Sequence, residues 1–193
     1  MSINKLKQLR EETGISLGEC KKALAEADGD IEKAKEILRK WGKELAGKKF
    51  ERETKEGVID IYLHPNKKVG VILDIRCESD FVARSEDFQK LAHEVCLQIA
   101  AMNPVFLKTE DIPEEFLTKE REIYQEQFKN SGKPEKVIGG IIEGKLKKHT
   151  EEISLLSQLY IRDETKTIKD LINETIAKIG ENIIIEKFIR YQI

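Results

Sequence analysis

Apolar residues recur every three or four positions in three stretches of the first 45 residues. The first stretch ends at Thr13-Gly14, and the third follows the turn sequence Asp28-Gly29-Asp30. Between them, Ser16 is followed three residues later by Glu19, which is the pattern of a capping box at a helix start. This spacing predicts three amphipathic helices. We expect residues 1–45 to fold as a compact three-helix module.

A different pattern begins at Val58, after a polar and charged stretch over residues 46–57. We interpret residues 46–57 as a linker that is helical at its start. Apolar and polar residues alternate over residues 58–63 and again over 69–75, on either side of a turn at His64–Lys68. Two such runs around a short Pro-Asn turn predict an antiparallel hairpin. The apolar run at residues 183–191 predicts a third strand that joins it.

Helical spacing returns between these strands. Ser85 is a predicted N-cap, because Glu86 and Asp87 follow it in a first turn that favours anions. Further helices are predicted over residues 113–130, 134–149 and 167–180, the first two opened by first-turn prolines. The fold class is therefore α+β, with a small antiparallel three-stranded sheet packed with helices. We expect residues 58–193 to form a core domain that also dimerises, because an uncovered apolar last strand invites association.

Charge and composition narrow the function. The chain has 34 Lys and Arg against 36 Asp and Glu, so its net charge of −2 argues against a general nucleic-acid binder. No stretch approaches the roughly 18 apolar residues of a membrane span, and the first residues lack the apolar block of a signal peptide. Three widely spaced cysteines favour a reducing compartment. We expect a cytoplasmic protein without direct contact to nucleic acid or membrane.

The chain lacks a convincing motif for nucleotide binding, metal binding or catalysis. Gly42 to Lys49 nearly matches a phosphate-binding loop, but Lys49 stands where Ser or Thr should bind magnesium, and a helix precedes the loop instead of a strand. The histidines show no metal-ligand spacing. Cys20, Cys77 and Cys96 lie at apolar positions and favour small buried thiols. We predict no catalytic residues, no metal and no cofactor, so an enzyme is not expected.

The stretch CESDFVARSEDF, residues 77–88, joins the predicted hairpin to a predicted helix. From the residues alone, Phe81 could be an ordinary core residue, with Asp80 as a helix cap and Val82 as packing. Alternatively, a short loop over residues 78–83, held by the hairpin and the helix, could push Phe81 into another protein at low entropic cost. The spacing leaves both interpretations open.

Three segments resemble one protein family. Residues 6–34, residues 76–89 and residues 131–158 are similar, in the same order, to segments of bacterial translation elongation factor Ts. The second contains a variant of that family's TDFVA signature, with Ser79 in place of threonine. The chain carries one copy of the core, so it resembles the short, dimeric form. Leu159-Tyr160 replaces the more usual Pro-Phe, which leaves the shape of that loop open.

The resemblance implies a guanine nucleotide exchange factor that binds GDP-bound elongation factor Tu as a homodimer in a 2:2 complex. Its three-helix module resembles a ubiquitin-associated (UBA) fold and would dock on the partner's nucleotide-binding domain. Phe81 would wedge into the partner and displace its Mg²⁺ support, so that GDP leaves. The residues implied in this step are Asp80, Phe81, Val82 and Ala83. The residues less firmly implied in docking are Arg10, Thr13, Gly14 and Leu17.

Two other functions fit parts of the pattern. A UBA-like adaptor without exchange activity would use the three-helix module and leave residues 76–89 without a special role. An RNA-binding accessory of translation would require salt-sensitive binding, which the near-neutral charge disfavours.

Overall fold

A computed structural model describes residues 2–129 and 134–193 of the protein. The chain divides into two compact units, with Met1–Ala100 and Lys169–Ile193 in unit 1 and Ala101–Ile168 in unit 2. Helices and antiparallel strands occur together, which confirms the predicted α+β class. The division into residues 1–45, 46–57 and 58–193 stays a prediction. Among the described residues, no helix combines the length and the apolar character needed to cross a bilayer.

The chain begins with the three predicted helices, α1 (Ile3–Thr13), α2 (Leu17–Glu26) and α3 (Ile31–Lys49). Their starts follow the predicted caps. The Ser16 hydroxyl accepts from the Glu19 amide at 3.3 Å and donates to the Glu19 carboxylate at 2.9 Å. Asp30 caps α3 by accepting from the Lys33 amide at 3.1 Å. Residues 42–49 lie inside α3, so this segment is not a phosphate-binding loop.

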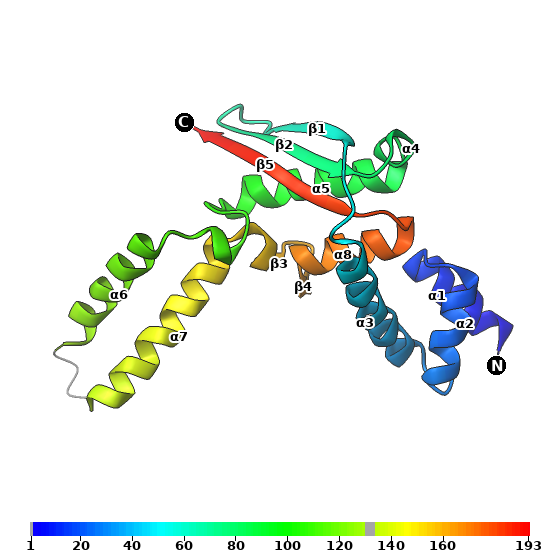
Figure 1. Ribbon diagram of the computed structural model, residues 1–193, viewed down its shortest axis with the longest axis horizontal. Helices are drawn as coiled ribbons and strands as arrows, with labels where there is room; N and C mark the ends of the chain where they lie inside the picture. The colour runs from blue at the N-terminus through cyan, green and yellow to red at the C-terminus, as the bar shows by residue number, and fades with distance from the viewer. Residues whose placement is uncertain (1, 130–133) are drawn as a thin grey trace. The chain divides into compact units, whose positions relative to one another are not determined.

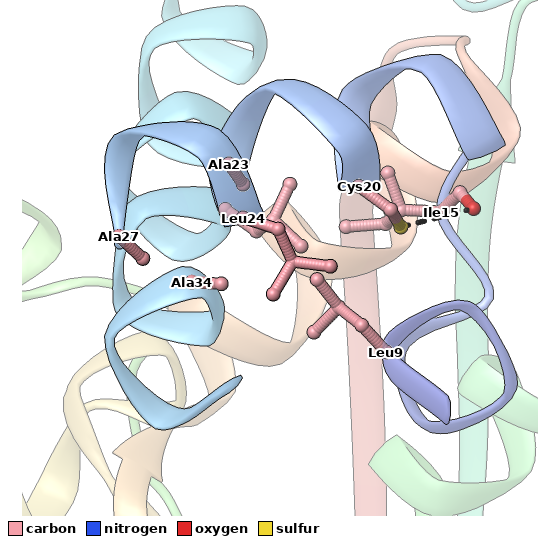
Figure 2. Packing of buried hydrophobic residues seen from close by; sticks show 8 residues of the cluster. Leu9, Ile15, Cys20, Ala23, Leu24, Ala27 and Ala34 are labelled. Atoms are coloured by element: carbon pink, nitrogen blue, oxygen red, sulfur yellow. Dashed lines mark hydrogen bonds between the residues drawn. The ribbon is translucent and has the colours of Figure 1, made fainter. Parts of the chain in front are cut away.

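Small and medium apolar side chains fill the space between these helices. Figure 2 shows Leu9 from α1 and Leu24 from α2 pointing toward Ala34 of α3. The Cys20 thiol, fully buried as predicted, donates to the Ile15 carbonyl at 3.6 Å. Buried alanines allow the helix axes to approach closely, so a short chain segment can still form a packed core. The buried residues of this core are Leu9, Ile15, Cys20, Ala23, Leu24, Ala27, Ala34 and Leu38.

The sheet of unit 1 contains β1 (Glu56–Leu63), β2 (Val69–Cys77) and β5 (Ile183–Gln192) in the order β1-β2-β5. Both pairings are antiparallel, and β2 lies in the centre. The predicted hairpin and the predicted third strand are therefore confirmed. A register shift at Asp74/Ile75 marks a bulge between β2 and β5.

One face of this sheet is covered by α5 (Glu86–Met102), which runs along it in Figure 1. Because side chains alternate between faces, every second residue of β2 points to the helix, and Val71, Leu73 and Ile75 are fully buried. Phe88 and Ile99 of α5 complete this core and are also fully buried.

Helix α8 (Ile168–Ile179) precedes β5 and ends at Gly180, whose φ of 90° closes the helix. Its residues in unit 1 contact α3. Lys43 lies 2.9 Å from the Asp170 carboxylate. A Cβ added at Gly42 would lie 3.4 Å from the Ala177 Cβ, so the two helices are in contact at this position.

Unit 2 contains α6 (Glu114–Phe128) and α7 (Glu135–Ile153), which lie side by side in Figure 1. Pro113 and Pro134 were predicted as first-turn residues, but they are the N-caps of α6 and α7. Each helix therefore begins one residue later than predicted. Residue 130, the predicted end of the first helix, lies outside the described residues.

Leu159–Tyr160 forms the short strand β3, paired with β4 (Asp163–Thr167). The loop whose shape the sequence left open is thus a two-stranded ribbon. The remaining elements are the short α4 (Asp80–Ala83) and two 3-10 turns, η1 (Thr109–Asp111) and η2 (Leu155–Ser157).

Candidate functional site

The residues between β2 and α5, one interpretation of which was a short loop over residues 78–83, form a capped helical turn. Ser79 has extended backbone dihedrals and caps α4, because its hydroxyl oxygen accepts from the Val82 amide at 3.4 Å. Ser85, the predicted cap of α5, accepts from the Phe88 amide at 3.4 Å and donates to the Val82 carbonyl at 2.7 Å. Two serines therefore fix the turn at its two ends.

Phe81 points away from the protein at the centre of this turn. Its side chain is 83% exposed, whereas Val82 and Ala83 are only 7% and 5% exposed. The interpretation of Phe81 as a core residue is thus wrong, while Val82 and Ala83 pack inward and anchor the turn. An exposed aromatic ring on an anchored element can contact another molecule at low entropic cost.

Asp80 stands beside Phe81 and is also accessible. Its carboxylate lies 3.3 Å from the Arg84 guanidinium, and the two side chains are 65% and 80% exposed. An ion pair in this exposed position stabilises the fold by less than about 1 kcal/mol. Asp80 can therefore exchange Arg84 for another partner at little cost.

A second layer of polar residues, missed in the sequence, holds the turn from the start of β5. Glu181 accepts two hydrogen bonds from Ser79, one from its backbone N–H at 3.0 Å and one from its hydroxyl at 2.7 Å. Glu78 accepts from the Asn182 backbone N–H at 2.7 Å. These pairs join residues more than 100 positions apart, so only the three-dimensional structure could reveal them.

The cysteines of unit 1 are structural. Burial raises the pKa of Cys77, immediately before the turn, to about 11, and that of Cys96, within α5, to about 12. Thiols with such pKa values hold their proton near neutral pH and are poor nucleophiles. In the described part of the chain, no group of three or more His, Cys, Asp or Glu side chains could hold a metal ion.

The four residues implied in docking lie where α1 meets α2. Gly14 ends α1 with a φ of 67°, and Leu17, the first residue of α2, is 45% exposed. Arg10 is exposed, but the Thr13 hydroxyl donates to the Leu9 carbonyl at 2.7 Å within its own helix. The structure thus leaves Arg10 and Leu17 available for contact and gives Thr13 and Gly14 local structural roles.

The outer face of the sheet is a second exposed surface, which we call the outer sheet face. Ile61, Ile72 and Ile189 are neighbours across the three strands, and they are 64%, 39% and 37% exposed. Its other end carries both charge signs, and Asp74 binds Arg76 at 2.8 Å. The exposed apolar residues of this face are Ile59, Ile61, Leu63, Ile72, Ile189 and Tyr191.

An anchored turn with an outward aromatic ring, together with an exposed apolar sheet face, is typical of a protein that acts by binding other proteins. Comparison with known sequences gives the family. The family model "Elongation factor TS" matches residues 5–193. The chain is 53% identical over 193 residues to elongation factor Ts of Thermosipho melanesiensis, covering all of this chain and 98% of the relative. It is 52% identical to the elongation factor Ts of Thermotoga petrophila, covering 96% of that protein. The chain therefore belongs to the elongation factor Ts family.

Proposed function

We propose that this chain is a guanine nucleotide exchange factor for elongation factor Tu, acting in the cytoplasm during translation elongation. It binds the GDP-bound partner and inserts Phe81 where the partner supports its Mg²⁺ ion, so that GDP leaves. Family membership supports the exchange role. The observation that carries the mechanism is the outward position of Phe81, 83% exposed on a turn whose next two residues are buried.

The ring can supply the energy for this step. An aromatic side chain that buries roughly 150–250 Å² at about 25 cal/mol per Å² gains on the order of 4–6 kcal/mol, which is an upper limit. If the gain is realised only when the partner's GDP site is disturbed, linkage requires that GDP affinity falls by the same coupling free energy. Each 1.4 kcal/mol of coupling changes affinity about tenfold.

Asp80 complements the ring electrostatically. Its exposed carboxylate can compete for groups that support the partner's Mg²⁺, because its own ion pair with Arg84 is weak. Loss of Mg²⁺ removes positive charge from the GDP phosphates and weakens their binding. Val82 and Ala83 hold the turn in place, and Arg10 and Leu17 of the three-helix module add contacts that dock the partner.

The test is release of a fluorescent GDP from elongation factor Tu. Catalytic amounts of the chain should accelerate GDP release. Phe81→Ala should lower the rate of the accelerated release at least a hundredfold, which corresponds to about 2.8 kcal/mol of lost coupling. Phe50→Ala is the matched control, because Phe50 is also exposed, at 73%. The mechanism fails if a folded Phe81→Ala protein exchanges normally or if both variants lose the same activity. An adaptor without exchange activity would bind partners yet leave GDP release unchanged.

We further propose that the chain is a homodimer in which two outer sheet faces pack on each other, giving a 2:2 complex with the partner. The apolar row across the three strands gives the contact its centre. The charged end carries Asp74 and Glu186 together with Arg76 and Lys187, so a copy related by two-fold symmetry can be placed with opposite charges facing each other. Residues 58–193 would thus be the dimerisation core, residues 1–45 the docking module and residues 46–57 the linker.

The mass in solution tests this proposal. The wild-type chain should sediment at twice its chain mass of 22.2 kDa, and Ile61→Glu, which places a charge in the apolar row, should sediment at the chain mass. Ile3→Glu is the control, since Ile3 is 72% exposed on α1, away from the sheet. A monomeric wild type, or a dimer that tolerates Ile61→Glu, would contradict the proposed contact.

A further inference from the structure

We propose that Glu181 is a positioning residue for nucleotide exchange, acting through Ser79 to hold the turn that presents Phe81. This inference rests on the proposed role of Phe81. Glu181 lies in the turn between α8 and β5, 102 residues from Ser79, and accepts both hydrogen bonds that Ser79 donates. It has no place in the signature that carries the family resemblance.

The turn needs support from outside because it is too short to be stable alone. Helix α4 spans four residues, whereas isolated helices below about 12 residues are marginal in water. Burial of Val82 and Ala83 fixes the turn's inner side. The direction of Phe81, however, depends on how the turn begins, and Ser79 is the residue where it begins.

Glu181 binds both hydrogen-bond donors of Ser79, its hydroxyl and its backbone N–H. A serine hydroxyl has one proton, and the 2.7 Å bond to Glu181 uses it. The lone pairs of the hydroxyl are therefore left for the Val82 amide, which is the cap of α4. At the same time the 3.0 Å bond from the Ser79 backbone N–H fixes the residue itself. Hydrogen bonds to a carboxylate are stronger than those between neutral groups.

The same arrangement extends the sheet beyond its last backbone pair. The ladder between β2 and β5 ends at Cys77 and Ile183. Past this point, Glu181 accepts from the Ser79 backbone and Glu78 accepts from the Asn182 backbone, so carboxylates replace carbonyls on each side. Asn182 is 2% exposed and donates to the Arg52 carbonyl at 3.0 Å. The turn is thus attached to the end of the sheet and to the residues before β1.

Without Glu181, the Ser79 hydroxyl can turn to other acceptors, α4 loses its cap, and Phe81 samples many directions. Binding must then reorder the turn, which opposes the displacement of GDP. The loss should lower the maximal rate of GDP release more than it raises the concentration of half-maximal effect, because docking through the three-helix module is unchanged. We expect Glu181→Ala to lower the maximal rate about tenfold, which corresponds to about 1.4 kcal/mol.

The test is a double-mutant cycle with Phe81, measured as release of fluorescent GDP from elongation factor Tu. In the protein that retains Phe81, Glu181→Ala should lower the rate of GDP release about tenfold. In the Phe81→Ala protein, the same substitution should have no further effect on that rate. Glu181→Gln retains one acceptor and should fall between wild type and Glu181→Ala. Glu164→Ala, which removes an exposed carboxylate from β4, is the matched control and should exchange normally.

The outcomes separate the two proposals. If Phe81→Ala slows exchange but Glu181→Ala does not, the positioning role is wrong and the Phe81 mechanism stands. An equal loss from Glu181→Ala in both backgrounds also refutes positioning, because Glu181 then acts independently of Phe81. Normal exchange by Phe81→Ala refutes both. Thermal unfolding of each variant verifies that the compared proteins are folded. If Glu181→Ala is not folded, Glu181→Gln takes its place in the test.

Discussion

Gly57, the second residue of β1, has no room for a side chain. A Cβ at this position would lie 2.3 Å from the Ile75 carbonyl oxygen and 2.8 Å from the Arg76 Cα, both in the backbone of β2. Strand β2 cannot retreat, because it also pairs with β5 at these residues. Gly57→Ala should therefore separate the beginning of β1 from β2.

The magnitude follows from this geometry. Inserting atoms into a packed site costs about 1–3 kcal/mol, and each backbone hydrogen bond lost costs about 1 kcal/mol more. We expect Gly57→Ala to lower the free energy of unfolding by about 2–3 kcal/mol, or roughly 4–12 °C in Tm at this chain length. Gly47→Ala is the control: no atom lies within 4 Å of its added Cβ, and it sits in α3. That change should stabilise the protein by about 0.5–1 kcal/mol.

The assay is urea unfolding followed by far-UV circular dichroism, at one protein concentration because association would shift the midpoint. The two substitutions add the same methyl group, so they change the hydrophobicity of the chain in the same way. The reasoning is refuted if Gly57→Ala unfolds at the wild-type midpoint, or if the two alanine variants shift in the same direction.

Three more predictions concern the buried cysteines, the Asp74–Arg76 pair and the cap of α3. At about pH 8, iodoacetamide should alkylate Cys77 and Cys96 much more slowly than an unfolded-chain thiol, because both thiols are buried and burial raises their pKa to about 11 and about 12. Equal alkylation rates, measured by mass spectrometry, would contradict this. The hydrogen bond from Arg76 lowers the pKa of Asp74, so this stabilisation is present above the unfolded carboxyl pKa of 3.8 and is lost as pH falls through the folded value. Asp74→Asn should therefore have a lower urea midpoint than wild type at neutral pH, and the gap should close in strong acid. Asp30→Ala removes the cap of α3 and should lower the free energy of unfolding in urea by about 1 kcal/mol. An unchanged free energy of unfolding would show that the cap does not stabilise the helix.

Local patterns were enough to predict most of the fold. The predicted strand at residues 183–191 is observed as Ile183–Gln192, and Ser16 and Ser85 cap the helices that they were expected to cap. Alternation and capping depend on neighbours within four residues, so one sequence can reveal them. The ends of α6 and α7 depend on packing, and α7 accordingly continues past the predicted residue 149 to Ile153.

The candidate site was only partly predictable. The sequence places Phe81 beside Val82 and Ala83, but it cannot show which of three adjacent apolar residues faces outward. That choice depends on where β2 and α5 lie around the turn. Glu181 was invisible for a different reason, because its partner Ser79 is 102 residues away. Contacts over such distances follow from the completed sheet and leave no local pattern.

Substitutions at Phe81, Gly57 and Glu181 should differ in how strongly they affect stability and how strongly they affect exchange activity. Phe81 is exposed, so Phe81→Ala removes almost no buried apolar area and should unfold like wild type while exchange falls most. Gly57 lies in the sheet with its backbone against that of β2, so Gly57→Ala should lose stability first. Glu181 connects the two, because its bonds to Ser79 join the end of the sheet to the turn. Loss of Glu181 should therefore reduce both properties, and it should reduce exchange only while Phe81 is present.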